Sequence, residues 1–357
     1  MSPAPTCVDL DDAGALLDAD REGLLRASAT AGAQVRATGA AVEEGALESI
    51  VGGQRPRSVI WLAGRGPAAT AGEVLIGILG ATAGEPLVSA ARVPPWIGPL
   101  DVLVVAGDDP ADPALVSAVA VAVRRGARVV VVAPFEGPLR EAGAGRAAVL
   151  APRLYSPEDF GLTRYLAAGL ATLAAVDPAI TTDLPVLADE LDAEALRNSA
   201  AREVFTNPAK ALAERFSGRP VVLAGDCPAT LGLARHGAAV LLRVAGHTVA
   251  ATGLADALVG LRRGVAAGFT DPVEALFHDE QIDGPMPGRP RVVALTLADE
   301  RAVLTARTAG IDDVDLIGAE DVGAGAAQPV ASSAEQQLAT LAVRLEMAAV
   351  YLRLAGG

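Results

Sequence analysis

The chain has 357 residues, of which 51% are hydrophobic but only 3% are aromatic, and its formal net charge is −14. That length suits two domains of ordinary size, with a core built mainly from Ala, Val and Leu. Lys210 is the only lysine and the arginines are scattered, which argues against nucleic-acid binding, because neutralising phosphates requires clustered basic side chains.

The N-terminal segment, 1–54, shows helical spacing of its apolar side chains. After it, three continuous apolar runs are typical of strands buried on both faces: SVIWLAG from Ser58, LDVLVVAG from Leu100 and ARVVVVAP from Ala127. Helical patterns separate these runs. Such alternation predicts an α/β fold with a parallel, doubly wound sheet, in a first domain at 55–153.

The stretch 154–217 carries no strand signal, and we expect helices there that link two domains. The first of them is predicted to begin at Ser156, a suitable N-cap, with Pro157 at the first helical position. Two more helices are expected at 187–200 and 208–216.

A sequence repeat then marks a second domain. WLAGRGPAAT in the first half of the chain is matched by VLAGDCPATL in the second half, with five identical residues at the same spacing. Each copy follows an apolar strand and opens a helix, so we predict two similar α/β domains in tandem, the second at 218–330. A long helix at 331–357 closes the chain and is capped by Ser332 or Ser333.

The segment TNPAKALAERFSGRPVVLAG, from Thr206 to Gly225, resembles the passage into the second domain of bifunctional phosphoglucose/phosphomannose isomerases. The closing helix, with Glu335, Tyr351 and Leu352, is similar to the last helix of that family. Those enzymes consist of two tandem sugar isomerase (SIS) domains. The resemblance therefore implies two three-layer αβα, flavodoxin-like domains, each with a five-stranded parallel sheet, and it implies a homodimer.

The resemblance also implies a sugar-phosphate site at two strand-to-helix turns. The first turn reads AGRGPAAT and keeps Gly64 and Gly66, where a tight turn favours glycine for backbone reasons. Arg65 is a candidate contact for an anion, and Thr70 is a candidate hydroxyl donor. The alternatives are a solvated arginine and an ordinary helix residue.

In the family, the second turn resembles Ser-x-Ser-Gly-x-Thr, whose hydroxyl and backbone N–H groups hold the phosphate at a helix N-terminus. Here the turn reads VAGDDPADP, so Gly107, Asp108 and Asp109 occupy it. A carboxylate about 4 Å from a phosphate repels it by about 4 kcal/mol at an effective dielectric near 20. We therefore expect little phosphate binding at this turn. Asp108 or Asp109 is predicted to cap the helix or to bind a cation or a hydroxyl group.

The related isomerases move a proton between C1 and C2 of an open-chain sugar phosphate. The resemblance places their catalytic Glu near 240–243, their His near 252–258 and their Lys beyond Gly357. Residues 240–243 include no carboxylate, and residues 252–258 include no histidine. We also expect no counterpart of the lysine.

Few other side chains in the sequence could replace the family's catalytic Glu, His and Lys. His247 precedes a predicted strand near the expected active-site edge and is the best of three histidines. His278 and Glu280 lie in the cluster FHDEQID, which suits either acid–base chemistry or a solvated helix end. No spacing of His and Cys is typical of a zinc site, and we expect no metal and no cofactor.

Together these features predict a carbohydrate-derivative binding protein on an isomerase scaffold, with a sugar phosphate as candidate ligand and without isomerase activity. An active isomerase with relocated catalytic residues and a protein-interaction partner are the alternatives. A dinucleotide-binding enzyme is disfavoured, because neither turn reads Gly-x-Gly-x-x-Gly followed by an acidic residue at the ribose distance. The N-terminus lacks a signal-peptide pattern and the apolar runs are too short to span a bilayer, so we expect a cytoplasmic protein without membrane contact.

Overall fold

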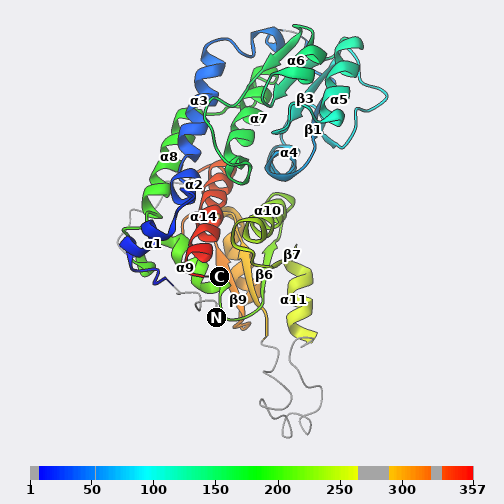
Figure 1. Ribbon diagram of the computed structural model, residues 1–357. Helices are drawn as coiled ribbons and strands as arrows, with labels where there is room; N and C mark the ends of the chain where they lie inside the picture. Colours follow the sequence, from blue (N-terminus) through cyan, green and yellow to red (C-terminus); the bar gives the residue numbers. More distant parts are fainter. Residues whose placement is uncertain (1–7, 53, 264–288, 323–331, 357) are drawn as a thin grey trace, which may run out of the picture.

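The computed structural model describes residues 8–52, 54–263, 289–322 and 332–356. Two parallel sheets lie at opposite ends of the molecule, and long helices along one side join them (Figure 1). The first sheet has the strand order β2-β1-β3-β4-β5 and the second has the order β7-β6-β8-β9. Both orders place the second strand of the domain at one edge and the first strand next to it. The predicted α/β class and the tandem arrangement are confirmed.

The three central strands of the first sheet, β1, β3 and β4, are buried on both faces, as their apolar runs predict. Its strands are β1 (Ser58–Ala63), β2 (Leu87–Ala90), β3 (Asp101–Ala106), β4 (Arg128–Val132) and β5 (Ala147–Val149). Its connecting helices are α4 (Gly66–Leu79), α5 (Pro113–Arg124) and α6 (Gly137–Gly143). Because successive side chains of a strand point to opposite faces, Val59 and Trp61 pack on the α4 side, whereas Ile60 and Leu62 pack on the side of α5 and α6.

The second sheet repeats this plan with fewer strands. It consists of β6 (Val221–Gly225), β7 (Ala250–Gly253), β8 (Arg291–Leu295) and β9 (Val314–Ile317), with helices α10 (Pro228–Ala245), α11 (Leu254–Arg263) and α13 (Ala298–Thr308). Leu223 faces the α10 side, and Ala224 faces Leu258 and Leu304 on the other. The expectation of five strands in this domain is wrong for the described part of the chain, where the sheet has four.

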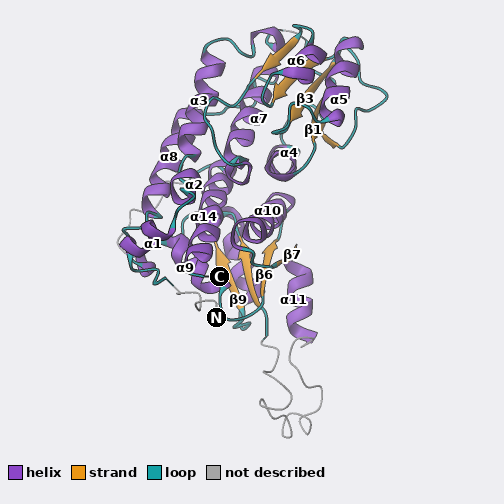
Figure 2. Ribbon diagram, in the orientation of Figure 1, coloured by secondary structure: helices purple, strands orange, loops and turns teal. Residues whose placement is uncertain are grey.

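The remaining helices form a layer along one side of the molecule, beside both sheets (Figure 2). They are α1 (Ala13–Ala19), α2 (Leu24–Ser28), α3 (Ala31–Glu43), α7 (Leu162–Val176), α8 (Leu184–Arg197), α9 (Pro208–Phe216) and α14 (Ala334–Leu354), with short 3₁₀ turns η1 (Glu48–Ile50), η2 (Glu158–Phe160) and η3 (Val204–Thr206). Helix α3 packs along α7 and α8, and α14 packs against α9 and α10. Helices α4 and α10, which follow the repeated turns, also pack against each other. Among the described helices, none has the length and apolarity that crossing a membrane requires.

One predicted helix start is wrong. The first linking helix does not begin at Ser156; the chain makes the turn η2 and enters α7 at Leu162, with Gly161 at the N-cap. The reason is that the Ser156 hydroxyl accepts a hydrogen bond from the Gln34 side chain of α3, 3.3 Å away, instead of capping a helix. The closing helix begins as predicted, with Ser333 at its N-cap.

The segment that carries the resemblance forms a joint between the linking helices and the closing helix. Asn207 caps α9 by accepting the backbone N–H of Lys210 at 3.0 Å. Lys210 itself is fully buried, and its Nζ donates to the carbonyls of Ala200 and Arg202 at 2.8 and 2.6 Å. The ring of Tyr351, on α14, lies 5.4 Å from the same Nζ. Burial lowers the pKa of Lys210, and the residue serves the fold.

Candidate functional site

The carboxyl ends of β1 and β3 lie side by side where the strand order of the first sheet reverses, which is the usual ligand position in an open parallel sheet. The turns after these strands border a pocket of about 200 Å³, which we call the sheet-1 pocket. Five of the seven predicted ligand-binding residues are among those that line it. The lining residues are Gly64, Arg65, Gly107, Asp108, Asp109, Asp112, Pro113, Leu115 and Glu158.

The other two candidates, Gly66 and Thr70, do not line this pocket. Gly66 has a φ of 61°, in the left-handed region, and a Cβ there would lie 3.0 Å from a Glu158 oxygen. Glycine is therefore required by the turn itself. The Thr70 hydroxyl donates to the Gly66 carbonyl at 3.4 Å, as serine and threonine commonly do inside helices.

Each aspartate of the second turn has a different partner. Asp112 is the N-cap of α5 and accepts a backbone N–H of its first turn at 2.8 Å. Asp109 accepts a backbone N–H two residues ahead, also at 2.8 Å. Asp108 forms a salt bridge of 2.7 Å with Arg164. The prediction that Asp108 or Asp109 caps the helix is therefore wrong, because Pro113 begins α5 and leaves Asp112 at the capping position.

The sheet-1 pocket is rich in hydrogen-bond acceptors. Glu158 reaches it from η2 and lies 3.9 Å from Arg65, whose side chain is 82% exposed. Arg164, which offsets the charge of Asp108, stacks on the ring of Tyr165 at 4.2 Å. Burial raises the pKa of Tyr165, so this phenol stays neutral. Four carboxylates thus line the pocket, and Arg65 is the one arginine among its lining residues.

Helix α10 of the second domain ends close to the first turn. Arg243, near its C-terminus, donates to Asp159 of η2, and its Nη1 would lie 3.8 Å from a Cβ at Gly66. The resemblance implied a catalytic carboxylate at 240–243. At that place the structure instead has the guanidinium group of Arg243, which is paired with the carboxylate of Asp159 in the linking segment.

Comparison with solved structures shows what fold this is. The tagatose-6-phosphate ketose/aldose isomerase from Escherichia coli matches 99% of this chain and 95% of its own, with a TM-score of 0.60 and 17% sequence identity. The C-terminal domain of glucosamine-fructose-6-phosphate aminotransferase from Francisella tularensis matches 96% of each chain, with a TM-score of 0.56 and 11% identity. The fold is that of two tandem SIS domains. No family model matches the sequence, and no curated protein matches it.

The second SIS domain has a larger pocket at the corresponding edge, with a volume of about 590 Å³. It lies between the β6 turn, the end of β7 and helix α4 of the first domain. Asp226 in the β6 turn is paired with Arg307 at 2.6 Å, and Arg235 lies 3.5 Å from Glu73. The charged side chains in this wall are thus already paired with other residues of the chain. Most of the remaining wall is apolar.

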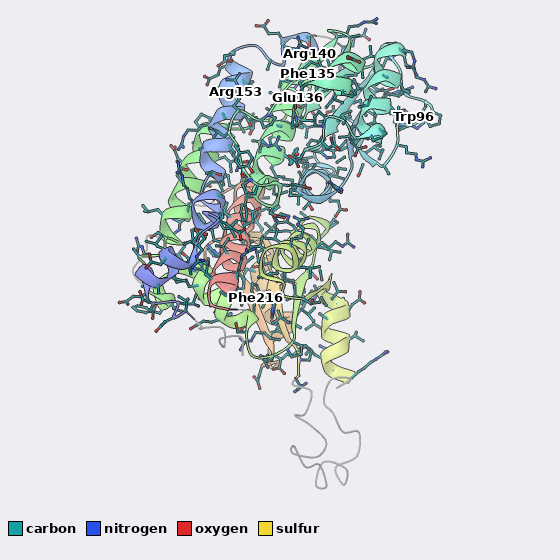
Figure 3. All side chains as sticks on the ribbon, in the orientation of Figure 1. Trp96, Phe135, Glu136, Arg140, Arg153 and Phe216 are labelled. Atoms are coloured by element: carbon teal, nitrogen blue, oxygen red, sulfur yellow. The ribbon has the colours of Figure 1, made fainter. Side chains whose placement is uncertain are left out.

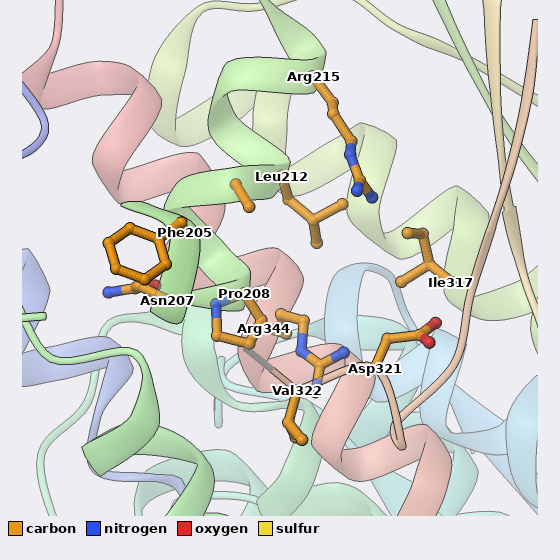
Figure 4. A pocket seen from close by; sticks show the side chains of 10 residues that line it. Phe205, Asn207, Pro208, Leu212, Arg215, Ile317, Asp321, Val322 and Arg344 are labelled. Atoms are coloured by element: carbon orange, nitrogen blue, oxygen red, sulfur yellow. The ribbon is translucent and has the colours of Figure 1, made fainter. Parts of the chain in front are cut away.

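A third pocket, of about 280 Å³, lies at the joint between α9, α14 and the end of β9, and Figure 4 shows its lining side chains. Arg344 is its buried cation. All three guanidinium nitrogens of Arg344 already donate to Glu194 or to the carbonyls of Gly318 and Ala319. The guanidinium of Arg344 is therefore held by other groups of the protein, and it serves the fold at this joint.

Of the three predicted acid–base candidates, only His247 lies among the residues that the structure describes, and it is not part of these pockets' walls. His247 follows α10 at the amino end of β7 and lines none of the three. His278 and Glu280 lie outside the described residues. Over the described ranges, no group of three or more His, Cys, Asp and Glu side chains is arranged to hold a metal ion.

A buried imidazole–carboxyl pair was not foreseen from the sequence. His236 on α10 and Glu346 on α14 are each only 1% exposed, and His236 Nε2 lies 2.9 Å from Glu346 Oε1. Burial raises the pKa of Glu346, and the His236 hydrogen bond opposes that rise only in part. The pair is almost completely buried and joins the second SIS domain to the closing helix.

Replacing Glu346 with glutamine is expected to remove a pH dependence of stability. A carboxyl whose folded pKa is raised stabilises the fold fully below its ordinary pKa of 4.5, and this stabilisation is lost as the pH rises through the folded pKa. The urea midpoint of the unmodified protein should therefore fall relative to that of Glu346→Gln as the pH increases from 4 to 7 (both values approximate). Glu335→Gln, on the same helix but not buried, is the control. Parallel pH profiles for the unmodified protein and Glu346→Gln would contradict the raised pKa.

Proposed function

We propose that this chain binds a carbohydrate derivative in the sheet-1 pocket without isomerising it. The position of the pocket supports this proposal, because it lies where open parallel sheets bind their ligands. The fold supports it too, since the solved structures with this fold include a tagatose-6-phosphate isomerase. The chemistry of the wall defines the ligand more closely.

The observation that carries the proposal is the set of four carboxylates in the pocket wall. Carboxylates only accept hydrogen bonds, so they suit the hydroxyl groups of a sugar and a protonated amine. They do not suit a phosphoryl group, which carries no hydrogen to donate when fully ionised. Arg164 offsets the charge of Asp108, and the well-exposed Arg65 lies 3.9 Å from Glu158. Asp109 and Asp112 accept backbone N–H groups and form no salt bridge within the described part of the chain. The pocket is therefore negative overall and favours neutral or cationic sugars.

A ranking of ligands tests this proposal. Isothermal titration is expected to give the tightest binding for D-glucosamine, weaker binding for D-glucose and the weakest for D-glucose 6-phosphate. The charge-assisted hydrogen bond of the amine supplies roughly a tenfold advantage over the corresponding hydroxyl. Asp109→Ala should reduce the glucosamine advantage, while Asp312→Ala, an exposed aspartate far along the sequence, should not. Tightest binding for the phosphate ester would contradict the proposal.

A further inference from the structure

A second pocket adjoins the first and shares Asp108 and Glu158 with it. We call it the linker pocket, because the connection from β5 to η2 forms its outer wall. It has a volume of about 380 Å³, and its other sides come from α3, the turn after β4 and the start of α7. It is lined by Gln34, Asp108, Pro134, Pro152, Arg153, Leu154, Tyr155, Ser156, Pro157, Glu158, Gly161 and Arg164.

Two side chains in this wall have unused hydrogen-bonding capacity. Arg164 is 8% exposed, and its Nη1 donor has no partner. Gln34 is 2% exposed, and its Oε1 acceptor has no partner. Buried polar groups are nearly always paired, and leaving one unpaired costs stability. One donor and one acceptor in the wall of the same pocket match a ligand hydroxyl group, which can both accept and donate.

The net charge of the linker pocket is small. Arg164 is paired with Asp108, and Arg153, which lies beside the end of α3 in Figure 3, donates to Glu44 at 2.8 Å. Glu158 lies 3.9 Å from Arg65, so each charged side chain of this wall has an oppositely charged neighbour. A neutral ligand is therefore better matched to this pocket than a phosphorylated one.

The rim of the pocket carries an unusual aromatic side chain. Tyr155 is 96% exposed, in a chain with only three tyrosines and two tryptophans. An exposed aromatic ring covers the C–H face of a sugar while its hydroxyl group stays in water. The Ser156 hydroxyl lies next to it in the same wall.

We propose that the linker pocket holds the hydroxylated body of a neutral sugar, with the Tyr155 ring covering one face and Gln34 and Arg164 pairing with a hydroxyl group. Both unpartnered atoms expose less than 1 Å² in the free protein, so binding includes a rotation of these side chains toward the pocket. This inference rests on the proposed function, because the two pockets share Asp108 and Glu158. It adds a subsite on the side of β4 and β5.

Saturation-transfer NMR with the full chain and D-glucose as probe tests this subsite. Tyr155→Ala is expected to weaken D-glucose binding by about fivefold or more, whereas Tyr155→Phe should bind within about twofold of the unmodified protein, because it keeps the ring. Phe205→Ala removes another exposed ring, 68% exposed and in a different pocket, and is the matched control. Tyr155 is on the surface, so its replacement is not expected to affect folding.

The outcomes separate the two proposals. Weaker binding for Tyr155→Ala with unchanged binding for Phe205→Ala supports the linker subsite. Binding that is lost in Asp109→Ala but unchanged in Tyr155→Ala overturns the subsite and leaves the sheet-1 pocket as the binding site. A lack of D-glucose and D-glucosamine binding to the unmodified protein overturns both.

Discussion

Replacing Arg344 with methionine is expected to lower the free energy of unfolding by about 3–5 kcal/mol, because it leaves a buried carboxylate without its main partner. Arg344 and Glu194 are 1% and 0% exposed, and Arg344 Nε lies 2.8 Å from Glu194 Oε1. The same guanidinium also donates to the carbonyls of Gly318 and Ala319 at 2.8 and 3.0 Å. These bonds join the closing helix to the linking helices and to the end of β9. Urea-induced unfolding followed by circular dichroism measures the effect.

The pKa of Glu194 indicates how much the carboxylate depends on this partner. Burial by itself raises the pKa, but Arg344, Arg197 and Asn198 outweigh it and hold the pKa below its ordinary value. Such a group stabilises the fold above the ordinary carboxyl pKa, and the stabilisation is lost as the pH falls through the folded pKa. The effect of Arg344→Met should therefore shrink in acid.

Two further variants make this test specific. Arg353→Met changes the same residue type on the same helix, but its partner Glu22 is 61% exposed, so its expected cost is below about 1 kcal/mol. Adding Glu194→Leu to Arg344→Met should recover part of the loss, because the unpaired charge is removed. Equal small losses for Arg344→Met and Arg353→Met would show that the buried network is unimportant for stability.

The double substitution Asp108→Ser and Asp109→Thr is expected to tighten binding of D-fructose 6-phosphate by at least about tenfold. One cause is the removal of charge repulsion, about 4 kcal/mol for a carboxylate 4 Å from the phosphate at an effective dielectric near 20, of which solvent screens roughly half. The other cause is that Arg164, now paired with Asp108 at 2.7 Å, becomes available to an anion. The new hydroxyl groups also donate to the phosphate. Isothermal titration measures the change in Kd.

The controls separate binding from folding. Asp108→Ser leaves the nearly buried Arg164 without its carboxylate, so it is expected to cost stability as well. Asp109→Thr alone avoids this cost, since Asp109 is exposed and bonds only to a backbone N–H; it should give a smaller gain in the same direction. Asp312→Ser is the neutral comparison. An unchanged Kd in the double variant would mean that the carboxylates are not what prevents phosphate binding.

The central strands could be predicted from the sequence because each is a continuous apolar run that is buried on both faces. β1, β3 and β4 are of this kind. β2, β5 and β7 have three or four residues each, lie at sheet edges and are partly exposed. Their sequences carry no strong pattern, so parallel pairing with a neighbouring strand decides their conformation.

The two turns of the sheet-1 pocket could also be predicted, because a turn between a strand and a helix has a local signature. Pairs of charged side chains that are distant in the sequence could not be predicted. Arg164 lies 56 positions after Asp108 of this pocket, and Glu346 lies 110 positions after His236 in the second domain. No local pattern specifies such pairs, since they form only when helices of the linking layer pack against the two domains. Asp112 was the exception, because a capping residue directly before Pro113 is a local signal that the prediction overlooked.

One proton NMR experiment in D₂O tests the central claim, that this scaffold binds sugars without isomerising them. The full chain is incubated with D-glucosamine, D-glucose 6-phosphate and D-mannose 6-phosphate, because moving a proton between C1 and C2 replaces the C2 hydrogen of an aldose phosphate with deuterium. We expect saturation transfer from the protein to D-glucosamine, while the C2–H signals of both phosphates keep their full intensity. Steady loss of a C2–H signal, or no transfer to any of the three sugars, would contradict the account.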